Sequence, residues 1–178
     1  MILLFKRYGI LLGLILSAFV FNGCDSGPDP LFTFPMEVNF TIPPGLNSFD
    51  THYFVYERIP TFYRNYVDAS SESSVDHINA GRGEIRARLD NIDWSIVREV
   101  AIHIVDPNDN NINKEAFYQD VVQFSGVEEL RLFSSLPELK DILFNDFITV
   151  EIRFNFRRVP FREMDARLTM NFVAYGPE

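Results

Sequence analysis

The stretch ITVEIRFNFR, residues 148–157, decides the fold because its apolar and polar side chains alternate without a break. In an extended chain successive side chains point to opposite faces, so a period of two predicts a β-strand with one buried face. A helix fails this test, because Ile148, Glu151 and Ile152 would share one face. A second alternating stretch spans residues 166–174. We expect these two strands to pair with each other in antiparallel orientation.

Weaker forms of the pattern recur along the chain between polar or proline-rich turns. Extended segments are expected at residues 36–42, 51–59, 84–90, 100–104 and 130–132, while residues 115–124 fit either a helix or a strand. Successive strands without intervening helices favour an antiparallel sheet. The predicted fold class is therefore all-β, an antiparallel β-sandwich, with a barrel as the alternative architecture. Immunoglobulin-like topology is our first expectation.

One short helix is expected near residues 136–143. Ser135 and Glu138 have the spacing of a capping box, in which both side chains bind the free amides at a helix start. Apolar residues follow at helical spacing. Residues 61–75 carry a second, shorter helical pattern that runs into an exposed loop.

The N-terminal residues have the layout of a secretory signal. Lys6 and Arg7 precede an uncharged, mainly apolar run at residues 9–21. As a helix this run would reach roughly 20 Å, short of the ~30 Å hydrocarbon core of a bilayer. The length therefore disfavours a membrane-spanning anchor.

The next residues, FNGC at 21–24, resemble the lipobox of bacterial lipoproteins, in which a small residue precedes a lipid-modified cysteine. Gly23 and Cys24 carry the resemblance, and Cys24 is the only cysteine of the chain. The resemblance implies cleavage before Cys24, fatty acyl chains such as palmitate on that residue, and attachment to a membrane of the cell envelope. We expect the outer membrane, with the domain facing the periplasm or the cell surface. The alternative is an ordinary cleaved signal, or an uncleaved anchor, with an incidental thiol.

The chain is thus expected to have three parts: a lipoprotein signal peptide at residues 1–23, a lipidated tether at 24–35, and a single β-sandwich domain at 36–178. Proline and glycine in the tether resist regular structure. Removing residues 1–23 leaves 14 basic residues against 25 acidic ones, a formal net charge of −11. That sign opposes phosphate binding, so no nucleic-acid partner is expected.

The sequence contains no catalytic constellation, and we predict no cofactor or metal site. The three histidines, His52, His77 and His103, lack the short spacings of a zinc site. Residues 106–111 open like a calcium loop but lack its central glycine and its closing glutamate. A polar hairpin turn is the favoured interpretation of this segment.

The candidate binding surface consists of Tyr53, Tyr56, Tyr63 and Tyr66, which lie in an aromatic-rich stretch. Exposed aromatic rings could contact a glycan or a protein partner, but burial in the core is the favoured interpretation for most rings of this stretch.

The leading functional hypothesis is a membrane-anchored, non-catalytic envelope lipoprotein that binds another envelope protein or a glycan, or serves as an accessory subunit. The alternative is an envelope hydrolase whose catalytic residues are dispersed in the sequence.

Overall fold

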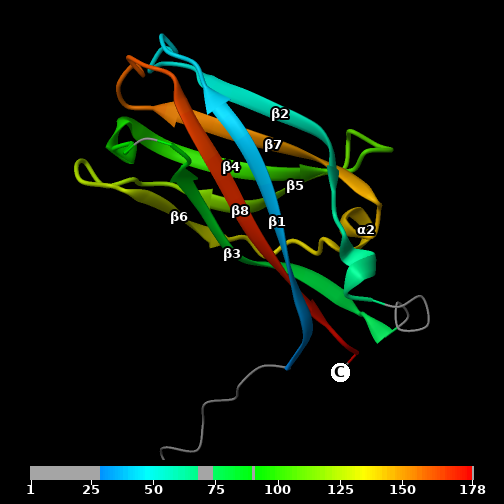
Figure 1. Ribbon diagram of the computed structural model, residues 1–178. Helices are drawn as coiled ribbons and strands as arrows, with labels where there is room; N and C mark the ends of the chain where they lie inside the picture. Colours follow the sequence, from blue (N-terminus) through cyan, green and yellow to red (C-terminus); the bar gives the residue numbers. More distant parts are fainter. Residues whose placement is uncertain (1–28, 68–73, 90, 178) are drawn as a thin grey trace, which may run out of the picture.

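The protein is described by a computed structural model that covers residues 29–67, 74–89 and 91–177 (Figure 1). The predicted all-β class is confirmed. Strands make up most of the described chain: β1 (Pro30–Ile42), β2 (Thr51–Pro60), β3 (His77–Ala87), β4 (Val97–Val105), β5 (Asn113–Gln119), β6 (Glu129–Ser134), β7 (Phe147–Phe156) and β8 (Met164–Tyr175).

The strands form two antiparallel layers, which we call layer A (β1-β8-β3-β6) and layer B (β5-β4-β7-β2). The layers are continuous only where β5 pairs briefly with β6. Figure 1 shows β1 and β8 crossing in front of the strands of layer B. The first strand pairs with the last, the second with the seventh, the third with the sixth and the fourth with the fifth. The predicted sandwich is confirmed, and its strand order is that of an eight-stranded jelly roll instead of the immunoglobulin-like order.

The expected pairing of the two most clearly alternating strands is wrong. β7 pairs with β2 and β4, whereas β8 pairs with β1 and β3. The connection at residues 157–163 therefore crosses from layer B to layer A and does not close a hairpin. Alternation shows which face of a strand is buried, but it does not show which strand lies beside it.

Layer A starts earlier than predicted. β1 begins at Pro30, so residues 30–35 belong to a strand and not to the tether, while residues 1–28 lie outside the described chain. Prolines are tolerated here because β1 is an edge strand, where an absent N–H breaks no inner ladder. Phe34 extends the alternation of residues 36–42 and is fully buried. Its ring lies 5.6 Å from that of Phe172 on β8.

The expected short helix is present as α2 (Lys140–Leu143), but it starts later than predicted. Ser135 and Glu138 do not form a capping box. The Ser135 hydroxyl donates to a Glu115 carboxylate oxygen at 3.0 Å. The Glu138 carboxylate accepts the first N–H of α2 at 2.6 Å and the Ile78 N–H at 3.1 Å. Glu138 therefore ties the start of α2 to β3.

The core lies between the two layers and is filled by the alternating side chains. Every apolar member of the 148–156 alternation is fully buried. Phe154 is central to an aromatic cluster, with ring centroids 6.0 Å from Phe40, 5.9 Å from Phe54 and 5.5 Å from Phe156. Since Phe40 belongs to β1 and Phe54 to β2, this cluster joins layer A to layer B.

Two glycines lie inside β3, although the sequence suggested that they precede the strand. Gly81 and Gly83 lie where the register of β3 against β8 shifts by one residue, which is a β-bulge. A Cβ atom on Gly83 would lie 2.7 Å from a ring carbon of Phe117. Glycine is therefore required for that ring to pack. Leu89, which belongs to the extended segment expected at residues 84–90, lies beyond the end of β3 and is exposed.

The two ambiguous segments are also resolved. Residues 115–119 of the stretch that fitted either a helix or a strand belong to β5, and a loop follows. Of the helical pattern at residues 61–75, the described residues 61–67 contain one 3₁₀ turn, Tyr63–Asn65. Tyr63 and Val67, four residues apart, are both buried.

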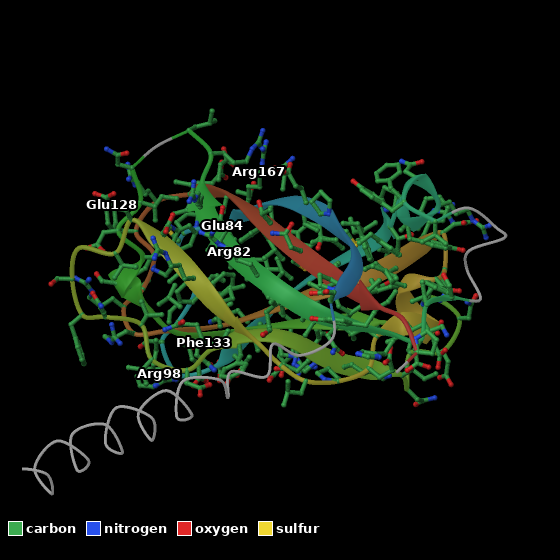
Figure 2. The ribbon with its side chains drawn as sticks, turned by 90° about the horizontal axis from the view of Figure 1, so that it is seen from below. Arg82, Glu84, Arg98, Glu128, Phe133 and Arg167 are labelled. Atoms are coloured by element: carbon green, nitrogen blue, oxygen red, sulfur yellow. The ribbon has the colours of Figure 1, made fainter. Side chains whose placement is uncertain are left out.

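The outer face of layer A carries paired charges. Figure 2 shows Arg82 and Glu84 side by side on β3, and their charged groups are 3.2 Å apart. Arg86 bridges Glu84 at 3.3 Å and Glu129 on β6 at 2.6 Å. The Arg131 side chain donates to Glu129, and this hydrogen bond is the main reason why the pKa of the Glu129 carboxyl group is lowered. Because these charges largely satisfy each other, this face offers little unpaired charge to a ligand.

Candidate functional site

The four tyrosines of the predicted binding surface do not come together. Tyr53 points outward from β2 and is exposed, while Tyr56 points toward the core, and burial raises the pKa of its hydroxyl. Tyr63 is buried and stacks on Phe144 at a centroid distance of 4.9 Å. Tyr66 is exposed near the start of β1. Only Tyr53 and Tyr66 are therefore available to a ligand, and they lie on different parts of the surface.

Four loops instead meet at one end of the sandwich, at the upper left of Figure 1. They comprise residues 43–50 between β1 and β2, 88–96 between β3 and β4, 120–128 between β5 and β6, and 157–163 between β7 and β8. Residue 90 is outside the described chain. We call this region the distal loop end, because β1 begins at the opposite end of the molecule.

Backbone hydrogen bonds join these loops to one another. The Gly45 N–H donates to the Pro160 carbonyl at 2.8 Å, which links the first loop to the last. The Trp94 N–H donates to the Val127 carbonyl, also at 2.8 Å, which links the two middle loops. The distal loop end is therefore one connected surface.

Arg157 connects three of the loops through its side chain. The guanidinium donates to the carbonyl oxygens of Ser95 at 2.8 Å, Val122 at 2.9 Å and Gln123 at 3.4 Å. It also lies 4.1 Å from the ring centroid of Phe124. A planar donor group of this kind can bind several carbonyls at once, which a lysine ammonium cannot do in the same geometry.

Asp93 makes a further connection between the middle loops. Its carboxylate accepts the N–H of Ser95 at 3.0 Å, which caps the 3₁₀ turn Trp94–Ile96, and the N–H of Val127 at 3.2 Å. These hydrogen bonds hold the pKa of Asp93 below its ordinary value, and the bond from the Ser95 N–H has the largest effect. The charged carboxylate is thus the form that stabilises the folded loops.

Asp93→Ala is expected to lower the free energy of unfolding at pH 7 by about 1 kcal/mol, because the cap is lost. A lowered pKa means that this stability is fully present above the ordinary value of 3.8 and disappears as the pH falls through the folded-state pKa. Urea unfolding at pH 7 and at pH 3 measures both effects. Asp120→Ala, at an exposed position of the same loop end, is the control and should change stability by less than about 0.5 kcal/mol. Equal stability of Asp93→Ala and the parent at pH 7 would contradict the capping role.

Each of the four loops carries one large apolar side chain that is more than three quarters exposed. These are Phe49 at 91%, Leu89 at 77%, Phe124 at 76% and Phe161 at 85%. A hollow of about 640 Å³ lies between the two middle loops, and Leu89, Ile92 and Val127 are among its lining residues. This cluster was not predicted, although Phe49 and Phe161 are large apolar residues within turn segments that separate expected strands.

A second feature is a polar hollow of about 300 Å³ on the outer face of layer B. Strand register places Tyr53, Arg153, Ala101 and Tyr118 in one row across β2, β7, β4 and β5. Ala101 is the small member of this row. The hollow therefore lies over Ala101, between larger side chains.

His103 lies beside this hollow, in the next row of layer B. Its Nδ1 atom is 2.6 Å from the Asn113 side-chain oxygen. The pKa of the imidazole is lowered mainly by burial and further by the nearby positive charge of Arg153. The Asn113 hydrogen bond and the carboxylates of Glu115 and Glu151 raise this pKa, but by less. A lowered pKa keeps His103 neutral at pH 7.

The three histidines lie in separate surroundings. The His52 ring contacts Phe156 and its Nε2 lies 2.9 Å from the Asn47 carbonyl, whereas His77 stacks on Tyr175. In the described part of the chain, no three His, Cys, Asp or Glu side chains are grouped so that they could hold a metal ion. Among residues 29–67, 74–89 and 91–177 there is also no helix with the length and apolar character needed to cross a bilayer.

Residues 106–111 form the predicted polar turn between β4 and β5. The Asp106 carboxylate accepts the Asn108 N–H at 2.7 Å, and the Asp109 carboxylate accepts the Asn111 N–H at 2.9 Å. Both carboxylates thus stabilise the turn.

Comparison with known proteins finds no matching family model and no matching curated protein. Solved structures similar to this chain include infectious bursal disease virus Gx strain, at 13% identity over 87% of this chain and 35% of that one, with a TM-score of 0.43. The decameric BFDV capsid protein is 12% identical over 83% of this chain and 99% of its own, with a TM-score of 0.40. Desmodium yellow mottle tymovirus is 10% identical over 85% of this chain and 91% of its own, with a TM-score of 0.31. The chain spans about a third of the length of the first of these, and no functional conclusion follows from such distant likenesses.

Proposed function

We propose that this protein is a lipid-anchored lipoprotein of the bacterial cell envelope, acylated at Cys24, that binds another envelope protein through its distal loop end. The observation that carries the proposal is the presence of one highly exposed apolar side chain on each of four hydrogen-bonded loops. Exposed apolar clusters of this kind are typical of protein contact sites. The protein acts as a binding or accessory module in the outer membrane and performs no reaction of its own.

The position of the loops relative to Cys24 supports this arrangement. β1 contains 13 residues and therefore spans roughly 40 Å from Pro30 to the distal loop end. Cys24 precedes Pro30 by six residues, which reach at most about 20 Å. An anchor at Cys24 thus lies near the start of β1, and the exposed phenylalanines point away from the anchoring membrane.

The chemistry of the distal loop end favours a protein over a nucleic acid or an anionic lipid. Phenylalanine and arginine are enriched where proteins contact each other, and both occur here, as in the Arg157–Phe124 pair. The same loops also carry acidic residues, including Asp50, Asp120 and Glu128. A surface of mixed charge is poorly suited to a dense array of phosphates.

Mass spectrometry of the mature N-terminus tests the anchor. The parent protein should begin at Cys24 with an acyl adduct, and Cys24→Ala should lack the adduct. An unmodified, freely soluble parent would contradict the lipoprotein assignment. The outcome does not depend on which partner the loops bind.

Site-specific photo-crosslinking in cells tests the loop contact. A crosslinker at position 124 should capture one defined envelope protein, and Phe161→Asp should abolish the capture. Leu136→Asp is the matched control, because Leu136 is 92% exposed but follows β6 at the opposite end of the sandwich. Equal loss with Leu136→Asp, or capture that survives Phe161→Asp, would count against the loop contact. Hydrolysis of an ester, peptide or glycoside panel by the purified protein would favour the alternative envelope hydrolase.

A further inference from the structure

We propose that the outer face of layer B binds a neutral carbohydrate in the hollow over Ala101. The lining of this hollow shares Asp120 with the distal loop end but includes none of that end's exposed apolar side chains, so the site can succeed or fail independently of the proposed function. Its volume of about 300 Å³ is at the lower end of the range for small-molecule sites. That size suits a short sugar segment better than a protein domain.

The shape of the hollow follows from strand register. Ala101 is opposite Tyr118 on one side and opposite Arg153 on the other, and Tyr53 follows Arg153 on the edge strand. The methyl group of Ala101 leaves space between these larger side chains. Two tyrosine rings therefore border one depression, and an aromatic ring can pack against the apolar C–H face of a sugar.

The polar side chains around the hollow are held in place by bonds to each other. The Thr51 hydroxyl donates to the Asn155 side-chain oxygen at 3.0 Å, and the Asn155 amide donates to the Glu99 carboxylate. The Arg153 guanidinium donates to Glu151 at 2.6 Å and lies 5.5 Å from the ring centroid of Tyr53. Side chains that are already ordered lose little freedom when a ligand binds.

The donors and acceptors indicate which ligand fits. Arg153 and Asn155 supply N–H donors, while the Thr51 hydroxyl oxygen and the Glu99 and Glu115 carboxylates supply acceptors. A sugar hydroxyl both donates and accepts, so it can bind both kinds of group. A cation would be repelled by the Arg153 guanidinium, and an anion would be repelled by the surrounding carboxylates.

The balance of charge excludes acidic sugars in particular. The hollow is lined by the acidic residues Glu99, Glu115 and Asp120 and by a single arginine, Arg153. His103, also in the lining, adds no charge at pH 7 because its pKa is lowered. Phosphorylated, sulfated or uronic sugars would be repelled by this excess of carboxylates. Neutral hexose or N-acetylhexosamine oligosaccharides are therefore the sugars that fit this hollow.

An oligosaccharide array tests the proposal, with the full chain purified in a detergent that has no sugar headgroup. The parent should bind neutral glucose-, galactose-, mannose- or N-acetylglucosamine-containing oligosaccharides and should not bind their sulfated or uronic counterparts. The strongest array ligand is then titrated calorimetrically against two variants. Ala101→Leu fills the hollow and keeps every polar group, and Tyr53→Ala removes one ring. Each should weaken binding by about tenfold or more.

Val55→Ala is the matched control, because Val55 lies on the same strand and face as Tyr53 but does not line the hollow. Val55→Ala should bind like the parent. Absence of any neutral ligand, preference for acidic sugars, or unchanged affinity in Ala101→Leu would each overturn the proposal. The fluorescence of Trp94, which is fully buried, confirms that every variant is folded.

Discussion

Phe154→Ala is expected to lower the free energy of unfolding by about 3–5 kcal/mol, the usual cost of emptying a fully buried phenylalanine site. The loss should fall at the upper part of this range. Phe154 contacts Phe40 of β1 and Phe54 of β2, and these strands are the outer edges of the two layers. Backbone hydrogen bonds fix each layer, so the cavity cannot close by a simple shift of one strand.

Urea unfolding followed by tryptophan fluorescence measures this loss, because the single tryptophan, Trp94, is fully buried. Phe161→Ala is the matched control. It removes the same side chain from a site that is 85% exposed, and the free energy of unfolding should change by less than about 0.5 kcal/mol. A Phe154→Ala protein as stable as the Phe161→Ala protein would show that the aromatic cluster does not hold the layers together.

Arg157→Ala is expected to lower the free energy of unfolding by about 2–3 kcal/mol. Hydrogen bonds that involve a charged group contribute more than neutral ones, and the substitution leaves the carbonyls of Ser95 and Val122 without their donor. The loops that carry Leu89 and Phe124 should also loosen. Faster amide hydrogen exchange at residues 120–128 would report that change directly.

Arg158 provides the control, because it is the neighbouring arginine and its side chain donates to the Ser95 hydroxyl at 2.8 Å. Arg158→Ala should lower the free energy of unfolding by less than half as much, since the Arg158 side chain is exposed and binds a hydroxyl that can rotate. Arg157→Lys should recover only part of the loss, because one ammonium cannot reproduce the planar donor group. Full recovery by lysine would mean that charge alone, and not the guanidinium geometry, supports the loops.

The elements of this fold could be predicted because each depends on local alternation. Residues 148–157 and 166–174 correspond closely to β7 and β8, and their apolar members are buried as expected. The pairing of the strands could not be predicted. In a jelly roll most partners are distant in sequence, and the alternation of a strand is the same whichever neighbour it has.

The errors at element ends also have physical causes. Pro30 and Pro35 indicated a tether, but an edge strand tolerates a residue without an N–H. Glu138 satisfied the spacing of a capping box, yet its carboxylate binds β3 as well as α2. In each case a tertiary neighbour, which the local pattern cannot reveal, decided the outcome.

The candidate sites were harder to predict from the sequence than the strands. Of the four predicted tyrosines only Tyr53 borders the hollow over Ala101, whose other lining residues come mainly from three further strands. The exposed side chains of the distal loop end come from four loops that are separated by up to 112 positions, from Phe49 to Phe161. Only the strand order brings them together.

The pairing of β1 with β8 also determines when this protein can fold. Among the described residues β1 pairs with β8 alone, and β8 lies near the C-terminal end of the sheet, so a chain still being synthesised cannot complete layer A. Such distant pairings make folding slow, on a scale of about milliseconds to seconds. Completion of the sandwich therefore waits until β8 is available to pair with β1.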